Sequence, residues 1–165
     1  MQPETPGPKV LIRLMTTADA NACSAIVCKS IIGERYGFSL EPMARTLSAA
    51  IEAGGELFVA ELAGAVAGFA WIDARGAFSS APYLRLIAVD ETLRGSGVGA
   101  ALLSEFEART ACIGRDWCLL VSDFNLPAQS FYEKKGYRRA GALSDFARPG
   151  ITEILMVKKR QPASV

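Results

Sequence analysis

The sequence contains no histidine among its 165 residues. Histidine is the side chain whose ordinary pKa lies near neutral pH, and its imidazole is the most common metal ligand in proteins. Its absence excludes Ser-His-Asp and Cys-His catalysis, zinc sites built on imidazole, and proton shuttles through histidine. Several large classes of enzyme are therefore ruled out at the start.

Cysteine is scarce as well, and its spacing does not suit a metal. The four cysteines form no CxxC pair: Cys23, Cys28, Cys112 and Cys118. A zinc or thioredoxin-like site therefore has no support, and we expect no metal. Small buried thiols are typical of a reduced, cytoplasmic protein, which is the expected location of this chain.

Long apolar runs and a surplus of basic charge are also missing. The clearest apolar stretch, residues 65–72, has the length of a strand and not the ~20 residues of a membrane span. The segment 1–9 is polar and rich in proline, unlike a signal peptide, and we expect a disordered lead-in. With 18 basic and 17 acidic residues the net charge is +1. Neither a nucleic acid nor a membrane is expected as a partner.

The length and the apolar content predict one compact domain over residues 10–160, followed by a tail at 161–165. The element order is β-α-α-β-β-β-α-β-α-β-β, which indicates a mixed sheet covered by helices, a single α/β domain. Residues 33–38 are expected to form a loop. Strands are predicted at 10–13, 57–62, 65–72, 83–89, 117–121, 137–143 and 151–157, and helices at 17–31, 41–53, 98–111 and 128–135.

Three glycines mark the junction between a predicted strand and a predicted helix. Gly95, Gly97 and Gly99 alternate with other residues there, directly after Arg94. Glycine permits positive φ and lets a ligand approach the backbone, while the N-terminal end of a helix offers free N–H groups and a positive dipole. This junction therefore predicts a site for a phosphate group.

Two kinds of phosphate ligand fit this junction poorly. The loop lacks the lysine of the GxxxxGK[ST] pattern, which excludes a nucleoside-triphosphate loop. The GxGxxG/A dinucleotide pattern is formally met by Gly95, Gly97 and Ala100, but residues 90–94 separate the first glycine from the strand. A Rossmann-type NAD-dependent oxidoreductase is thus kept as a weaker alternative.

The chain resembles the GNAT superfamily of N-acyltransferases in two segments. The first is the acetyl-CoA loop pattern [QR]-x-x-G-x-[GA], met within 86–103 by Arg94, Gly97 and Gly99. The second, residues 119–139, is similar to the family's sequence of strand, Asn, small residue, Tyr and Gly-aromatic, through Val121, Asn125, Ala128, Tyr132, Gly136 and Tyr137. The resemblance extends over residues 10–160. It implies direct transfer of the acetyl group of acetyl-CoA to a primary amine of a small molecule or peptide, with no metal, and it is compatible with a homodimer.

The resemblance also assigns roles to residues. The backbone of Ile87, Ala88 and Val89 would bind the pantetheine arm, and the strands 83–89 and 117–121 would splay to admit the thioester. Asn125 would contact the cofactor arm, or else cap a helix. Tyr132 would protonate the leaving sulfur as general acid, or else be one more core aromatic. The pyrophosphate would be held by Arg94, Gly95, Ser96, Gly97, Val98 and Gly99.

The general base and the acceptor stay open at this stage. Many family members carry a glutamate on the strand before the loop, whereas residues 83–89 offer only Arg85. Asp73, Asp123 or a chain of waters could replace it. The acceptor side would comprise residues 33–38, 71–73 and 144–150, and neither the amine nor the acyl group is specified.

Two further alternatives are a GNAT-like module that binds acyl-CoA without transferring it, and a pure interaction domain without a ligand.

Overall fold

The computed structural model describes residues 9–160, so the predicted tail, and the predicted lead-in apart from Lys9, lie outside the described residues. The chain forms two compact units. Of the described residues, the first unit contains those up to Trp71 together with Ile87–Glu105, and the second contains Ile72–Leu86 together with those from Phe106 onward. Each unit is described by itself.

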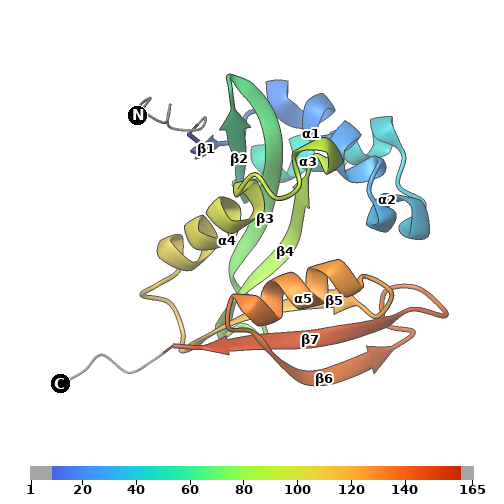
Figure 1. The fold of residues 1–165 in the computed structure, drawn as a ribbon, viewed down its shortest axis with the longest axis vertical. Helices are drawn as coiled ribbons and strands as arrows, with labels where there is room; N and C mark the ends of the chain where they lie inside the picture. Colours follow the sequence, from blue (N-terminus) through green and yellow to red (C-terminus); the bar gives the residue numbers. More distant parts are fainter. Residues whose placement is uncertain (1–8, 161–165) are drawn as a thin grey trace, which may run out of the picture. The chain divides into compact units, whose positions relative to one another are not determined.

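Seven strands are hydrogen-bonded in the order β1-β2-β3-β4-β5-β7-β6 (Figure 1). The β4–β5 pair is parallel, whereas β1–β2, β5–β7 and β6–β7 are antiparallel. The predicted mixed α/β fold class is thereby confirmed. The strands are β1 Leu11–Leu14, β2 Glu56–Leu62, β3 Ala65–Ala77, β4 Ala81–Val89, β5 Asp116–Ser122, β6 Arg138–Ser144 and β7 Thr152–Lys159.

The first unit carries the helices that precede β2. They are the short 3-10 helix η1 Thr17–Asp19 and the helices α1 Ala20–Cys28, α2 Ile31–Tyr36 and α3 Leu40–Glu52. Helix α4, Val98–Arg109, begins in this unit and ends in the second. The apolar core of the first unit contains four fully buried side chains, those of Leu47, Phe58, Phe69 and Leu102.

Helix α2 corrects the prediction of a loop at residues 33–38. Ser30 begins this helix by accepting a hydrogen bond from the Gly33 N–H at 3.2 Å, and Gly37 ends it in the left-handed conformation (φ 68°). Glycine usually disfavours a helix, which is why Gly33 was expected to lie in a loop. In the structure, Gly33 allows the start of α2 to lie close to the end of α1, because a Cβ at this position would lie 2.3 Å from the Val27 carbonyl oxygen.

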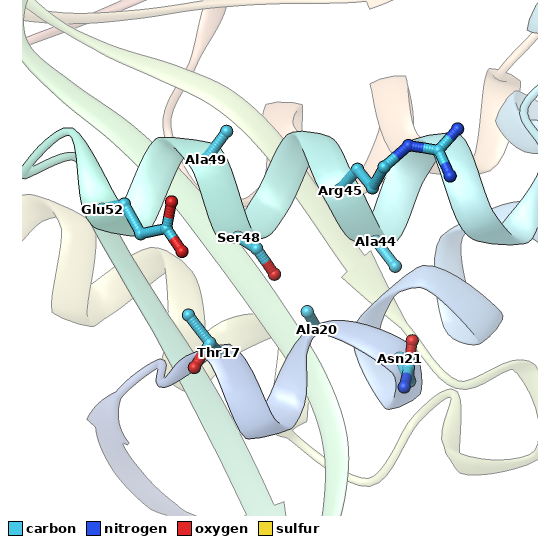
Figure 2. Close-up of a pocket in the computed structure, with 8 residues that line it drawn as sticks. All are labelled: Thr17, Ala20, Asn21, Ala44, Arg45, Ser48, Ala49 and Glu52. Atoms are coloured by element: carbon cyan, nitrogen blue, oxygen red, sulfur yellow. The ribbon is translucent and has the colours of Figure 1, made fainter.

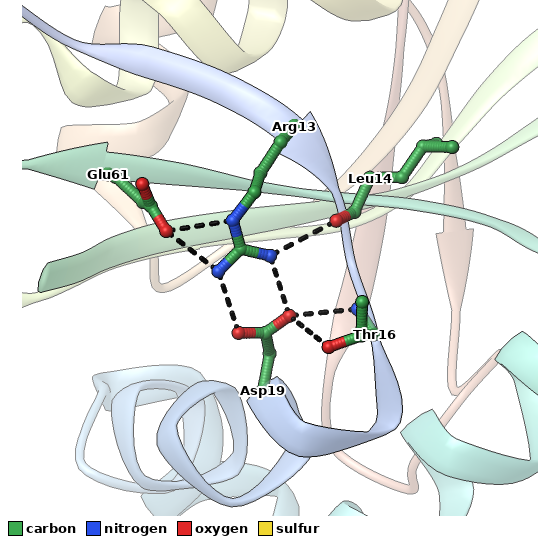
Figure 3. Close-up of polar contacts among 5 residues, drawn as sticks. All are labelled: Arg13, Leu14, Thr16, Asp19 and Glu61. Atoms are coloured by element: carbon green, nitrogen blue, oxygen red, sulfur yellow. Dashed lines mark hydrogen bonds and ion pairs between the residues drawn. The ribbon is translucent and has the colours of Figure 1, made fainter. Parts of the chain in front are cut away.

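An ion cluster centred on Arg13 of β1 connects this strand with its neighbours in the fold (Figure 3). The guanidinium donates to both carboxylate oxygens of Asp19, at 2.8 and 2.9 Å, and to Glu61 Oε1 at 2.8 Å. Asp19 Oδ2 also accepts from the Thr16 N–H at 2.8 Å. The Arg13 hydrogen bonds hold the pKa of Asp19 well below its usual range. The cluster therefore joins β1, η1 and β2 through one buried carboxylate.

In the second unit, helix α5, Leu126–Lys134, lies along the sheet formed by β5, β7 and β6 (Figure 1).

A second ion cluster holds the end of α4 in place. Lys158 Nζ lies 2.7 and 2.9 Å from the two carboxylate oxygens of Glu107, and the Tyr137 hydroxyl donates to the same carboxylate at 3.1 Å. The Lys158 ammonium also stands 5.5 Å from the ring centre of Trp117. Such contacts of a partly buried cation with an aromatic face add stability.

Candidate functional site

The glycine segment follows a tightly hydrogen-bonded turn in the first unit. Asp90 comes directly after β4, and its Oδ1 accepts from the Thr92 N–H at 2.9 Å and from the Thr92 hydroxyl at 2.7 Å. These hydrogen bonds lower the pKa of Asp90. The turn of 3-10 helix that results, Glu91–Leu93, leads the chain from the strand into the glycines.

Gly95 and Gly97 adopt left-handed backbone conformations, with φ of 82° and 88°. An added Cβ at either position would meet nothing within 4 Å, so the space above the backbone is open. The Ser96 hydroxyl donates to the Leu93 carbonyl at 2.5 Å, and the Ala101 N–H donates to the Gly97 carbonyl at 2.9 Å, which begins α4. The first N–H groups of α4 therefore have no acceptor within the helix and lie next to this open space.

The six residues predicted to hold a pyrophosphate lie together. Arg94 to Gly97 form the loop, and Val98 and Gly99 form the first turn of α4. The Arg94 guanidinium lies 3.0 Å from Glu91 Oε1, and both side chains are about half exposed. Free helix N–H groups, a cation and an open space over glycine fit the chemistry of a pyrophosphate.

The three residues predicted to bind the pantetheine arm, Ile87, Ala88 and Val89, end β4 in the same unit. The Asp90 N–H continues this strand by donating to the Ala67 carbonyl at 2.8 Å. The next residue of β3 is Gly68, and a Cβ there would lie 2.7 Å from the Ala88 carbonyl oxygen. The end of β4 is thus packed tightly against β3 directly before the loop.

The other predicted residues lie in the second unit, where the ladder between β4 and β5 is short. Among the described residues this parallel ladder has two pairs, Tyr83–Cys118 and Leu84–Leu119, although β5 continues to Ser122. Asn125 caps α5, its Oδ1 accepting from the Ala128 N–H at 3.4 Å.

Tyr132 lies on the buried face of α5 with 5% of its surface exposed. Its ring centre is 5.3 Å from that of Phe131 and 5.8 Å from that of Tyr137. Burial raises the pKa of Tyr132, and the nearby Tyr83 phenol raises it further. The phenol therefore keeps its proton at neutral pH. Tyr83 was not among the predicted site residues, because in the sequence it is an ordinary strand aromatic.

Two carboxylates predicted as candidate bases each accept a hydrogen bond from a backbone N–H group. Asp73 Oδ1 accepts from the Arg75 N–H at 3.1 Å. Asp123 is exposed, and its Oδ2 accepts from the Thr152 N–H at 3.4 Å.

A third carboxylate, Glu153 on β7, was missed by the sequence analysis. It is 5% exposed, and the Ser122 hydroxyl donates to its two oxygens at 3.2 and 3.5 Å. Burial raises its pKa. The sequence does contain a signal, an acidic residue between the apolar residues Ile151 and Ile154, but the depth of its burial depends on the strand register.

The segments predicted for the acceptor side lie on both units. Tyr36 and Phe38, with ring centres 5.8 Å apart, belong to the first unit. The turn 145–150 belongs to the second, where Asp145 Oδ1 accepts from the Gly150 N–H at 2.6 Å. Residues 71–73 span the boundary between the units.

A hollow of about 420 Å³ opens elsewhere in the first unit (Figure 2). Ser48 and Glu52 of α3 face it from one side, and Thr17 and Asn21 from the other. None of its lining residues was predicted as a site residue. The hollow is a gap between two packed helices and has no part in the predicted site.

Within residues 9–160, no group of three or more cysteine, aspartate or glutamate side chains is placed to hold a metal ion. The four cysteines are free thiols. Among the helices of this same span, none is long and apolar enough to cross a membrane.

Comparison with known proteins identifies the family. The family model described as "Acetyltransferase (GNAT) domain" matches residues 53–139, more than half of the chain. The chain therefore belongs to the GNAT acetyltransferases. It is also 37% identical over 81 residues to a blasticidin-S acetyltransferase of Streptomyces morookaense, a match that covers 47% of this chain and 56% of that protein. The chain thus matches only about half the length of this relative.

Solved structures share the fold. A GNAT-family acetyltransferase from Bacillus cereus has a TM-score of 0.75 at 19% identity, over 93% of this chain and 99% of that one. The protein yncA of Salmonella typhimurium, solved with its cofactor acetyl-CoA, has a TM-score of 0.69 at 16% identity, over 94% of this chain and 96% of its own. These similarities concern the fold alone.

Proposed function

We propose that this protein is an acetyl-CoA-dependent N-acetyltransferase that transfers the acetyl group directly to a primary amine. The observation that carries the proposal is the loop from Arg94 to Gly99, which joins open glycine backbone, a cation and free helix N–H groups within a GNAT domain. The solved relative that contains acetyl-CoA supports the choice of cofactor.

Acetyl-CoA, when bound, supplies an activated acetyl group as a thioester. The loop residues bind the pyrophosphate, and the backbone of Ile87, Ala88 and Val89 orients the pantetheine arm. Tyr132 Oη holds the proton that the departing sulfur requires. Asn125 caps α5, and its proposed contact with the cofactor arm would be an additional role.

Blasticidin S is the first acceptor to test, because the relative named for it shares 37% identity with this chain over 81 residues. A peptide amine is the second, since a ribosomal-protein-alanine N-acetyltransferase of Brucella melitensis shares the fold at 23% identity and a TM-score of 0.71. The free thiols favour a reducing compartment, the cytoplasm. A homodimer stays a prediction.

Thermal unfolding with acetyl-CoA, CoA and NAD tests the cofactor. A ligand that binds only the folded state at 100 times its Kd adds ~2.7 kcal/mol of stability. We expect a higher melting temperature with acetyl-CoA and no change with NAD. A shift with NAD alone would favour the oxidoreductase, and no shift with acetyl-CoA would contradict the proposal.

Release of free CoA thiol in the presence of amines tests the reaction itself. We expect thiol release that depends on the amine and an acetylated product detected by mass spectrometry. Binding of acetyl-CoA without thiol release from any amine would favour the non-catalytic acyl-CoA-binding module.

A further inference from the structure

A polar pair follows two apolar pairs on one face of the sheet in the second unit. Ser122 and Glu153 stand directly opposite each other in the antiparallel ladder of β5 and β7. Side chains alternate between the faces of a strand, so the next pairs on the same face are Leu120–Leu155 and Cys118–Val157. Both of those pairs are apolar, and the carboxylate stands at their end.

Glu153 is a carboxylate buried beside these apolar pairs. Only 5% of its surface is exposed, and Ser122, which donates to it, is 3% exposed. Burial of a carboxylate is unfavourable, and perturbed carboxylates of this kind are frequent at functional sites. The raised pKa makes this group a stronger base than an ordinary glutamate.

The pair lies at the strand end to which the helix of Tyr132 is attached. Gln129 Nε2 donates to the backbone carbonyls of Ser122 and Asp123, at 3.1 and 3.0 Å. Gln129 and Tyr132 are three residues apart on α5, and both are buried on the same helix face. Gln129 thus connects the end of β5 to α5, the helix that also carries Tyr132.

The two groups approach that strand end from opposite faces of the sheet. Arg139 donates to Gln129 Oε1 at 2.8 Å, so the row that contains Arg139 and its partner Met156 faces α5. Glu153 is three residues before Met156 on β7 and hence faces the other side. Tyr132 and Glu153 therefore lie on opposite faces of this sheet.

The geometry points to Glu153 as the group that takes the proton from the acceptor's ammonium, with Ser122 orienting its carboxylate. This inference rests on the proposed function and deepens it. An N–H bond of the ammonium breaks, its electron pair stays on nitrogen, and the proton goes to a Glu153 oxygen. The nitrogen then bonds to the acetyl carbon as the C–S bond breaks, and Tyr132 gives its proton to the departing sulfur. The nitrogen loses a second proton, which restores the Tyr132 phenol. Glu153 finally returns its proton to solvent.

Thiol release with blasticidin S and a panel of primary amines tests the inference, with acetyl-CoA-dependent melting shifts as the readout of folding and cofactor binding. Glu153→Gln preserves the shape and the contact with Ser122 but cannot take the proton. We expect a normal melting shift and a loss of at least ~10²-fold in turnover. Glu107→Gln is the matched control, because it removes a half-buried carboxylate of the same unit that belongs to a structural ion pair.

Chemical rescue separates catalysis from structure. Added formate is expected to restore part of the turnover of Glu153→Ala and none of that of Tyr132→Phe. If Glu153→Gln does not fold, Glu153→Asp replaces it and is expected to lose about tenfold or more because its carboxylate is set back.

Three results would each overturn the inference. The first is wild-type turnover in Glu153→Gln or Glu153→Asp, and the second is a Glu153→Ala variant that binds acetyl-CoA normally but is not rescued by formate. The third is a loss of turnover in Asp123→Asn that is absent from Glu153→Gln. Absence of turnover by the wild type with every amine would overturn the proposed function, and the inference with it.

Discussion

Gly68 on β3 lies so close to the Ala88 carbonyl oxygen that a Cβ would stand 2.7 Å from it. The same Cβ would lie 3.0 Å from Val98 Cγ1 and 3.2 Å from Leu102 Cδ1. Gly68 therefore sets the distance from β3 to both the end of β4 and the first turns of α4. These are the elements on either side of the glycine loop.

Gly68→Ala is expected to lower the free energy of unfolding by about 1–3 kcal/mol, because the backbone of β4 and the start of α4 must shift. The shift also displaces the loop and weakens acetyl-CoA binding, measured by calorimetric titration. Gly141→Ala is the control, since a Cβ there meets nothing within 4 Å. Equal stability of Gly68→Ala and wild type would refute the close packing.

Gly97→Ala tests the loop conformation. A left-handed backbone costs about 1–2 kcal/mol for a residue with a Cβ, so the loop should lose stability and acetyl-CoA should bind more weakly. Gly54→Ala introduces the same strain at φ 81° elsewhere in the first unit, also in open space. We expect both variants to melt earlier and only Gly97→Ala to lose affinity. Parallel losses of affinity would show that the loop has no special role.

Tyr132→Phe removes the proposed proton donor and leaves the ring packing intact. Turnover is expected to fall by at least ~10²-fold while acetyl-CoA affinity is retained. Tyr137→Phe is the matched control, a buried tyrosine whose hydroxyl donates to Glu107. It should lose roughly 1.5–3 kcal/mol of stability and keep its turnover. Unchanged turnover in Tyr132→Phe would reject the assignment.

The stability contributed by Asp19 should depend on pH. Its pKa in the folded state lies below the unfolded value, so the contribution is full above about pH 4 and is lost as the pH falls through the folded pKa. Asp19→Asn is expected to be less stable by about 1–3 kcal/mol at neutral pH, with a smaller difference in acid. Urea unfolding at several pH values measures this.

Glu41→Gln is the control for that series. Glu41 and Arg45 are 89% and 71% exposed and 3.7 Å apart, so their pair should contribute less than about 0.5 kcal/mol. A difference between Asp19→Asn and wild type that stays constant down to acid pH would show that the Arg13 pair does not set the pKa of Asp19.

Local sequence patterns predicted most of the elements. Short apolar runs and the turn at Gly64 located all seven strands to within a few residues. Strand β3 extends beyond its predicted end at residue 72 to Ala77. Helix α2 was not predicted, because glycine disfavours a helix and Gly33 was therefore placed in a loop. The presence of Gly33 is explained only by its close approach to the Val27 carbonyl in the folded structure.

The sequence by itself determined the glycine loop, since positive φ and free helix N–H groups follow from which residues are neighbours in the chain. It also determined the family, through the loop and the segment around Tyr132. Only the tertiary structure decided which carboxylate is buried, because Ser122 and Glu153 meet through strand register across 31 residues. The same holds for Arg13 and Glu61, 48 residues apart. These contacts depend on how distant strands pair, which no local sequence pattern specifies.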